Sequence, residues 1–358
     1  MVAGYCGSKS SSVNREHCQA KTESPLWRGG ATDCDLTATY DKVATRIETE
    51  ILRDITGSPP NKSRCSGEAP ALLRSDEQGD VFTTEQTASR ADDMMNAPVP
   101  PVYVDRASQV LCRERKMSEQ LRYAVPDRFD NVTHVYRPLE YAAEPHANYV
   151  RRCLGHGWSV PVLVLGMNPG PFGMCQTGVP FGEIAAVRDW MGVSGSVGLP
   201  HYLQHPNLPI TGFSCRRSEV SGRRFWGLWQ SRCDTPDRLF RHVYVHNFCP
   251  LAFVESTDRT RNVTPEELSG PLRQQLEYIC QQALVDIINV LGVRTVVGVG
   301  RYAEDQAKKA LAAAGRRGQV QVHYLMHPSD SNPQAHNDWE EQADEQLTQA
   351  GVLPFPQW

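Results

Sequence analysis

The sequence contains no long apolar run and no paired cysteine motif. No segment approaches the roughly 18 consecutive apolar residues that a membrane-spanning helix needs. Residues 1–9 lack the apolar core of a secretory signal peptide, so we expect the chain not to be secreted. None of the 11 cysteines is spaced as Cys-x-x-Cys, which argues against a zinc ribbon. The odd number also argues against a disulfide framework, and we expect reduced thiols.

An excess of charge of either sign is also missing. The chain has 37 Lys and Arg against 41 Asp and Glu, which gives a net charge of −4. This balance excludes a protein that holds nucleic acid by bulk charge alone, although it leaves room for a local basic patch.

Large side chains are scarce in the first third of the chain. Only five aromatic residues fall within residues 1–115, and the segment ends in the proline-rich run 97–102. So few large side chains cannot offset the ordering entropy of a core. We therefore predict a mostly disordered tail over 1–115 and a folded domain over 116–358.

Apolar residues become periodic from about residue 116. Apolar runs of strand length predict four strands, over 160–165, 243–247, 295–299 and 320–325. Helical spacing predicts helices over 117–123, 182–193, 264–291, 301–314 and 333–349, and the third of these opens with a capping pattern at Thr264 and Glu267. Strands that alternate with helices are typical of an α/β fold with a parallel sheet covered on both faces.

Polar side chains follow three of the four predicted strands. Asn168 lies in a loop rich in glycine and proline, Asn247 ends the second strand, and His327 follows the fourth. Taken singly, such residues are more often turn formers than catalysts. Parallel sheets bind ligands beyond the carboxyl ends of their strands, so convergence of the three predicts one site. Two amides and an imidazole suit a planar hydrogen-bonding group and assistance to a leaving group.

Longer segments carry a resemblance to a known family. They include Gly166-Met-Asn-Pro-Gly-Pro-Phe-Gly-Met, Val245-His-Asn-Phe-Cys-Pro and His327-Pro-Ser, with further matching segments over 139–150, 176–183, 218–227 and 291–301. In this order they resemble the single-strand-selective monofunctional uracil-DNA glycosylases, over about 117–358 and not over the tail. The resemblance implies a three-layer α/β/α uracil-glycosylase fold with a four-stranded parallel sheet.

The resemblance also implies a reaction. The expected protein is a base-excision-repair glycosylase that hydrolyses the N-glycosidic bond of uracil and of 5-substituted uracils, such as 5-hydroxymethyluracil. It would act on single- and double-stranded DNA and leave an abasic site. No metal, no cofactor and no Schiff-base lysine is implied. We expect a nuclear monomer whose partner is damaged DNA, with no membrane association.

Roles for single residues follow from the same resemblance. Asn168 would orient the attacking water without acting as a base, because an amide cannot take a proton. His327 would donate to the uracil oxygen that gains charge. Asn247 would match uracil N3–H and O4, and Phe181 would stack on the base. The pocket would be lined by the backbone of Met167 and by Gly170, whose missing side chain leaves room for a 5-substituent.

Contacts to DNA are expected at two loops. The loop after the second strand leads to a helix N-terminus, where phosphates bind well, and its candidates are Arg259, Arg261, Asn262 and Thr264. Solvated loop arginines are an equal reading of this stretch. The loop after His327 contributes Ser329, Asp330, Ser331 and Asn332. A further basic cluster is either surface charge or a weak nuclear-import signal; it comprises Arg216, Arg217, Arg223 and Arg224.

One of these loops departs from the family. Its members follow His-Pro-Ser with Pro-Arg, and that arginine helps to push into the duplex as the base leaves. This chain has Asp330 and Ser331 at these places. Opening a paired base costs more than capturing an unpaired one. We therefore expect a stronger bias toward single-stranded or mismatched uracil than in the rest of the family.

Two other classes of enzyme share features with this sequence. The run 298–303 fits the Gly-x-Gly-x-x-Ala pattern of dinucleotide-binding oxidoreductases, but no acidic residue follows at the end of the next strand. A cysteine hydrolase built on Cys175, His327 and Asn247 is chemically possible. Both are disfavoured against the glycosylase reading.

Overall fold

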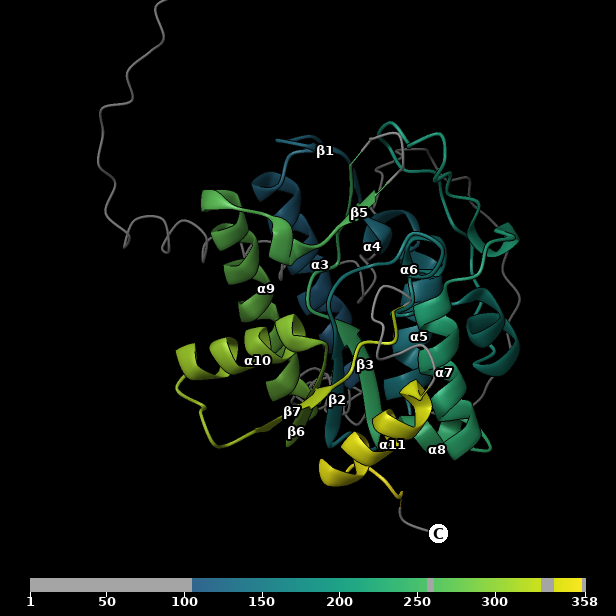
Figure 1. Cartoon of the computed structure of the whole chain (residues 1–358), viewed down its shortest axis with the longest axis vertical. Helices are drawn as coiled ribbons and strands as arrows, with labels where there is room; N and C mark the ends of the chain where they lie inside the picture. Colours follow the sequence, from purple (N-terminus) through teal and green to yellow (C-terminus); the bar gives the residue numbers. More distant parts are fainter. Residues whose placement is uncertain (1–104, 256–260, 330–337, 356–358) are drawn as a thin grey trace, which may run out of the picture. The chain divides into compact units, whose positions relative to one another are not determined.

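The parallel sheet predicted from the sequence is present. The computed structural model describes residues 105–255, 261–329 and 338–355 (Figure 1). Within them, one sheet has the strand order β3-β2-β6-β7, and every pairing in it is parallel. Its strands are β2 (Val162–Gly166), β3 (Val243–Asn247), β6 (Thr295–Val299) and β7 (Gln321–Leu325). The predicted α/β fold class and its four-stranded sheet are thus confirmed.

The register of this sheet brings the ends of its strands to one edge. Gly166 pairs with Asn247 across β2 and β3, and Val299 pairs with Leu325 across β6 and β7. The loops after β2, β3 and β7 therefore leave from the same side of the sheet. These are the loops that carry Asn168 and His327, while Asn247 closes β3 itself.

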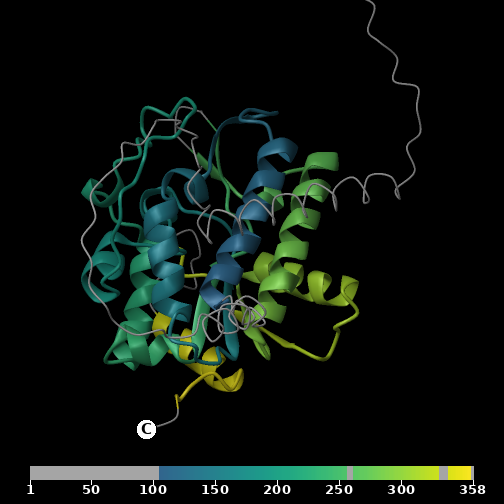
Figure 2. The same ribbon diagram turned by 180° about the vertical axis from the view of Figure 1, so that it is seen from behind.

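Helices cover both faces of the sheet. Every residue of β2 and β3 is buried, which requires packing on both sides. Seen from behind, α3 lies between α5 and α9 and packs on both (Figure 2). No described helix is long and apolar enough to cross a membrane. The helices are α3 (Arg106–Ala124), α4 (Pro138–Tyr141), α5 (Ala143–Leu154), α6 (Met174–Thr177), α7 (Val220–Arg232), α8 (Pro236–Phe240), α9 (Gly270–Leu291), α10 (Arg301–Ala313) and α11 (Trp339–Gln349).

A second, antiparallel sheet was not predicted. It consists of β1 (Val132–Tyr136), β4 (Ala252–Glu255) and β5 (Arg261–Val263), in the order β1-β4-β5. The three strands are short, and β5 has only three residues, two of them exposed. Such segments carry no clear hydrophobic pattern, so the sequence does not distinguish them from loops.

The folded domain begins earlier than predicted. Helix α3 starts at Arg106, so the expected boundary at residue 116 falls inside a helix. The Asp105 side chain caps this helix by accepting from the Ser108 backbone N–H at 3.0 Å. Val110 and Glu114 are buried within the stretch that the sequence assigned to the tail. Many charged residues surround these few buried positions, so the helical spacing of the apolar residues was not recognised in the sequence.

Two other predicted helices begin later than expected. Thr264 and Glu267 do form a capping box, but it opens a 3-10 turn over Pro265–Glu267, and α9 starts only at Gly270. Helix α11 starts at Trp339, and the predicted stretch 333–337 lies outside the described residues. The expected helix over 182–193 contains a π-helical turn, Ala186–Trp190.

Candidate active site

Strand β2 ends at a glycine, Gly166, that leaves room for two functional side chains. A Cβ atom on Gly166 would lie 2.2 Å from Oδ1 of Asn247 and 2.7 Å from Cε2 of Phe181, so no side chain fits there. Residues predicted separately, on β3 and on the loop after α6, therefore meet at the end of β2. This contact is the centre of the site.

Phe181 is held in an unusual backbone conformation. Its φ is +51°, in the left-handed region that costs a non-glycine residue free energy. Its ring stacks on Phe225 of α7 with centroids 4.3 Å apart, and the Trp226 indole donates to the Pro180 carbonyl at 3.2 Å. The centroid of the His327 ring lies 6.2 Å from that of the Phe181 ring. Packing thus fixes a flat aromatic ring close to both Asn247 and His327.

Asn247 is almost completely buried, with 3% of its surface exposed. Its amide nitrogen contacts the Met174 sulfur at 3.1 Å. A thioether is a weak acceptor, so this contact can be exchanged for a stronger one at little cost. The side chain is therefore positioned but available to a polar ligand.

Asn168 is held by the continuation of the β2–β3 ladder. Beyond the strands, Phe248 N–H donates to Gly166 O and Cys249 N–H to Met167 O, both at 2.9 Å. The Asn168 amide then donates to Leu251 O at 3.3 Å. Asn168 is partly exposed, so the amide lies where solvent can reach it.

His327 is partly buried, and burial lowers the pKa of its imidazole to about 4. The ring is therefore neutral at physiological pH and carries a proton on one nitrogen only. Gly300 lies alongside, since a Cβ there would be 3.7 Å from His327 Cβ and 3.8 Å from Cδ2. The Arg224 guanidinium donates to Pro328 O at 3.1 Å and fixes the turn that leads to Ser329.

Gly170 faces a carboxylate that the sequence did not predict. A Cβ on Gly170 would lie 1.6 Å from Oε1 of Glu219. Burial raises the pKa of Glu219, although its carboxylate accepts from Phe172 N–H at 3.1 Å and from the Ser221 hydroxyl at 3.3 Å. The space beside Gly170 is therefore occupied, and the expectation of open room there is wrong in this detail. Glu219 lies within the matching segment 218–227, which was the available signal.

Sequence comparisons identify the family to which this site belongs. The model of the uracil DNA glycosylase superfamily matches residues 154–348. The chain belongs to this superfamily. The single-strand selective monofunctional uracil-DNA glycosylase of Rattus norvegicus is 52% identical over 222 residues, 62% of this chain and 77% of the rat protein. Its Bos taurus counterpart is 47% identical over 250 residues, 70% of this chain and 88% of the bovine protein.

These matches confirm the resemblance found in the motifs. A crystal structure of Pedobacter heparinus SMUG2 aligns with 66% of this chain and 97% of its own, at 15% identity and a TM-score of 0.46. The family assignment does not depend on that structure. The protein is thus a uracil-DNA glycosylase with DNA as its substrate.

In the predicted DNA-binding loop after β4, two described residues of the glycosylase already bind other side chains. Arg261 forms ion pairs with Glu255, at 2.8 Å, and with Glu267. Thr264 is engaged in the capping box, and Asn262 is exposed on β5. Arg259 lies outside the described residues, as do Asp330, Ser331 and Asn332, whereas Ser329 is described and partly exposed. A phosphate at Arg261 would have to compete with two carboxylates.

The second basic cluster instead borders the site of the glycosylase. The Arg217 guanidinium lies over the Phe172 ring, 3.6 Å from its centroid. Arg216, Arg217 and Arg223 are exposed, and none of the three forms an ion pair with another described residue. Phe172 follows Gly170 in the pocket loop, and Arg224 binds the loop after β7. The cluster therefore lies beside both loops.

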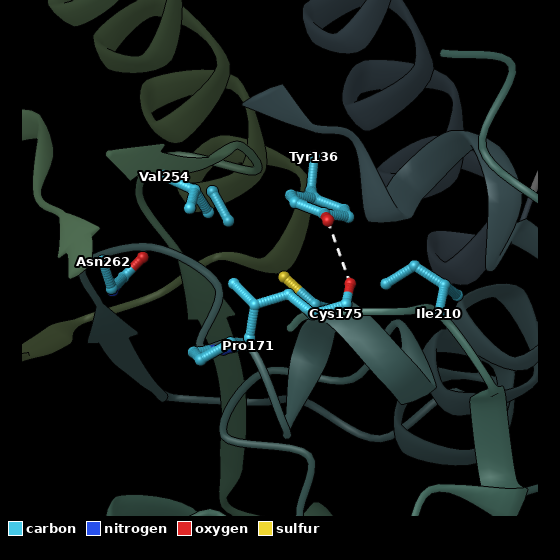
Figure 3. Close-up of a pocket in the computed structure, with 8 residues that line it drawn as sticks. Tyr136, Pro171, Cys175, Ile210, Val254 and Asn262 are labelled. Atoms are coloured by element: carbon cyan, nitrogen blue, oxygen red, sulfur yellow. Dashed lines mark hydrogen bonds between the residues drawn. The ribbon is translucent and has the colours of Figure 1, made fainter. Parts of the chain in front are cut away.

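The two alternative enzyme classes lose their support in this glycosylase. Gly298 lets α10 pack closely on β6, because a Cβ there would lie 2.4 Å from Glu304 N. Cys175 is 2% exposed, and burial raises the pKa of its thiol, which disfavours a thiolate nucleophile. Figure 3 shows its sulfur pointing into a small apolar cavity lined by Tyr136, Pro171, Ile210 and Val254, where the Tyr136 hydroxyl donates to Leu208 O at 2.9 Å.

Proposed function

We propose that this glycosylase hydrolyses the bond between uracil N1 and the deoxyribose C1′ and leaves an abasic site. The observation that carries the proposal is the meeting of Gly166, Asn247 and Phe181 at the end of β2, with His327 beside them. A base must leave the helical stack to be cut, and these residues form a place for a flat ring with a polar edge.

In this proposal, Phe181 and Asn247 select the base. The fixed Phe181 ring stacks on uracil, and the Asn247 amide gives up its Met174 contact to accept from N3–H and donate to O4. Cytosine presents the opposite pattern of donor and acceptor at these two atoms. Burial of Asn247 makes such a mismatch costly, because the unpaired amide could not turn to water.

Asn168 and His327 act on the bond itself. Asn168 holds the water whose oxygen bonds to C1′ as the bond to N1 breaks and leaves its electron pair on the base. The water then loses one proton to solvent, and the other stays on the new hydroxyl of the abasic sugar. His327 is neutral, so it stabilises the developing negative charge on a uracil oxygen by hydrogen bonding rather than by transferring a charge. Neither residue acts as a general base, so most of the rate acceleration comes from stabilising the departing uracil.

The test is a cleavage assay with a labelled oligonucleotide that contains one uracil. Alkali added after the reaction reveals abasic sites, and an identical strand with thymine is the control. We expect alkali-dependent cleavage of the uracil strand only. His327→Leu should lower the single-turnover rate about 10²–10³-fold, the loss that follows removal of one such donor. Asn168→Ala should be severely impaired. A loss below about tenfold for His327→Leu would remove it from the mechanism.

The proposed substrate range favours single strands and includes 5-hydroxymethyluracil, whose substituent would lie beside Glu219 rather than in open space at Gly170. Both relatives bear the words single-strand selective in their names. In this chain Asp330 and Ser331 stand where the family has Pro-Arg, and Asp330 carries the wrong charge beside phosphates. The check is the ratio of single-turnover rates on single-stranded uracil and on a U·A duplex. Asp330→Pro combined with Ser331→Arg should raise the duplex rate and barely change the single-strand rate.

For contacts to the DNA backbone we favour the cluster beside the pocket over Arg261. Arg216, Arg217 and Arg223 are exposed cations, and phosphates flanking an extruded base pass close to the loops that hold that base. Arg261 remains a candidate that must first exchange its carboxylate partners.

A further inference from the structure

Three buried titratable residues form a cluster behind the pocket. They are Glu114 of α3, His146 of α5 and His246 of β3, and their exposed fractions are 2%, 5% and 5%. Nε2 of His146 lies 2.8 Å from Oε2 of Glu114, and Nδ1 of His246 lies 3.2 Å from Oε1 of the same carboxylate. None of the three has a part in the proposed reaction.

The partners of His146 define its protonation state. Its Nδ1 lies 2.8 Å from the Gly178 carbonyl oxygen, which can only accept, so this nitrogen carries a proton. Burial disfavours the charged forms, but the carboxylate and its hydrogen bond raise the pKa of His146, and the two imidazoles lower the pKa of Glu114 to about 2. The cluster is therefore a buried imidazolium–carboxylate pair with His246 as a third member.

The two histidines of the cluster are linked to different segments of the chain that form the pocket. His146 binds the carbonyl of Gly178, three residues before Phe181. Gly178 has a φ of +72°, and a Cβ there would lie 2.7 Å from Ala142 O, so this turn cannot shift easily toward α5. His246 directly precedes Asn247, and adjacent strand residues point to opposite faces. Glu114 thus joins the backbone that carries the stacking ring to the strand that carries the amide.

We propose that Glu114 and His146 are positioning residues that set the spacing between Phe181 and Asn247. This inference rests on the proposed roles of those two residues in binding the base. Both side chains are buried, and the pair acts through the Gly178 carbonyl and through His246. A displacement of about 1 Å between such groups can cost about 100-fold in rate.

The test compares Glu114→Gln with a matched control on the same helix. Leu121 of α3 is fully buried and lies outside the cluster, so Leu121→Ala destabilises the helix without breaking the pair. Single-turnover excision is measured on single-stranded uracil at a temperature well below both melting midpoints. We expect Glu114→Gln to lose about tenfold to a hundredfold in rate, with affinity for an undamaged strand unchanged. Leu121→Ala should keep the rate of the unaltered enzyme.

Equal rates in the two variants would overturn the proposal and leave the cluster a stabilising element only. If Glu114→Gln does not fold, Tyr244→Phe takes its place, because it deletes only the hydroxyl that lies 3.4 Å from the Glu114 carboxylate. It should then slow excision more than Leu121→Ala does, and an unchanged rate would again overturn the proposal.

A spectroscopic readout separates this inference from the proposed function. Should the unaltered protein excise no uracil, the proposed function fails. The position of the Asn247 side-chain amide can still be followed by its ¹⁵N-resolved NMR signal. A shift of this signal in Glu114→Gln, but not in Leu121→Ala, supports positioning. An unmoved signal refutes it.

Discussion

The imidazole of His327 can take up a proton but is partly buried, and its burial makes the stability of the enzyme depend on pH. The folded ring has a pKa of about 4, whereas an unfolded histidine has a pKa near 6.5. Below pH 6.5 the unfolded chain binds a proton that the folded chain does not. Stability is therefore fully present above pH 6.5 and is lost as the pH falls toward 4.

We expect the free energy of unfolding to fall by about 1–2 kcal/mol more in the unaltered enzyme than in His327→Leu between pH 7 and pH 4.5. The range allows for the partial exposure of the ring. Urea unfolding of both proteins at the two pH values measures the difference, which cancels the contribution of other histidines. A larger loss in the variant would mean that His327 is protonated in the folded enzyme.

Gly170 offers a second prediction, on base selection. A tyrosine placed there alone would collide with Glu219, so its effect on the pocket could not be interpreted. Gly170→Tyr combined with Glu219→Ala provides the space for the ring. We expect this pair to suppress release of 5-hydroxymethyluracil at least tenfold more than release of uracil, which a clash with one small substituent can achieve. Glu219→Ala alone is the control, and equal loss on both bases would show only a damaged pocket.

At the scale of elements, two segments are candidates for contact with DNA. One is the loop before α7 together with the start of that helix, and the other is the strand β5. Arg217 and Arg223 form no ion pair among the described residues, whereas Arg261 is held by two carboxylates. Each phosphate contact adds about one to the slope of log affinity against log salt. Arg217→Ala with Arg223→Ala should lower the slope by about two, measured by fluorescence anisotropy on a labelled strand. Arg261→Ala should leave it unchanged, and the reverse ranking would restore the loop after β4 as the main contact.

At the scale of the whole molecule, helix α3 decides where a shortened enzyme can begin. A chain that starts at Asp105 keeps the cap, the buried Val110 and the Glu114 pair, so we expect its melting midpoint and excision rate to match the full chain. A chain that starts at Met117 loses these contacts and should be less stable by about 5 kcal/mol or more. Thermal unfolding and the cleavage assay test both. Loss of activity on starting at Asp105 would give residues 1–104 a part in the fold.

A structural feature can be predicted from this sequence when its signal lies within one continuous segment of the chain. The runs that became β2, β3, β6 and β7 are continuous and apolar, so their burial was predictable, and topology then implied that Asn168, Asn247 and His327 share one edge. The strand β5 is too short to show a period. The contact between Gly170 and Glu219 joins residues far apart along the chain. The absence of a side chain at Gly170 gave no sign of what occupies that space.

The left-handed backbone of Phe181 has a consequence for substitution. Glycine in a folded chain usually costs about 0.5–1 kcal/mol relative to alanine, because it has more freedom to lose. At a φ of +51° the order should invert, since alanine retains the steric conflict that glycine lacks. We expect the free energy of unfolding of Phe181→Gly to exceed that of Phe181→Ala by about 1 kcal/mol, although both lose the ring. Urea unfolding of the two variants measures this difference. The pocket is then shaped during folding, and an incoming base meets a surface that is already rigid.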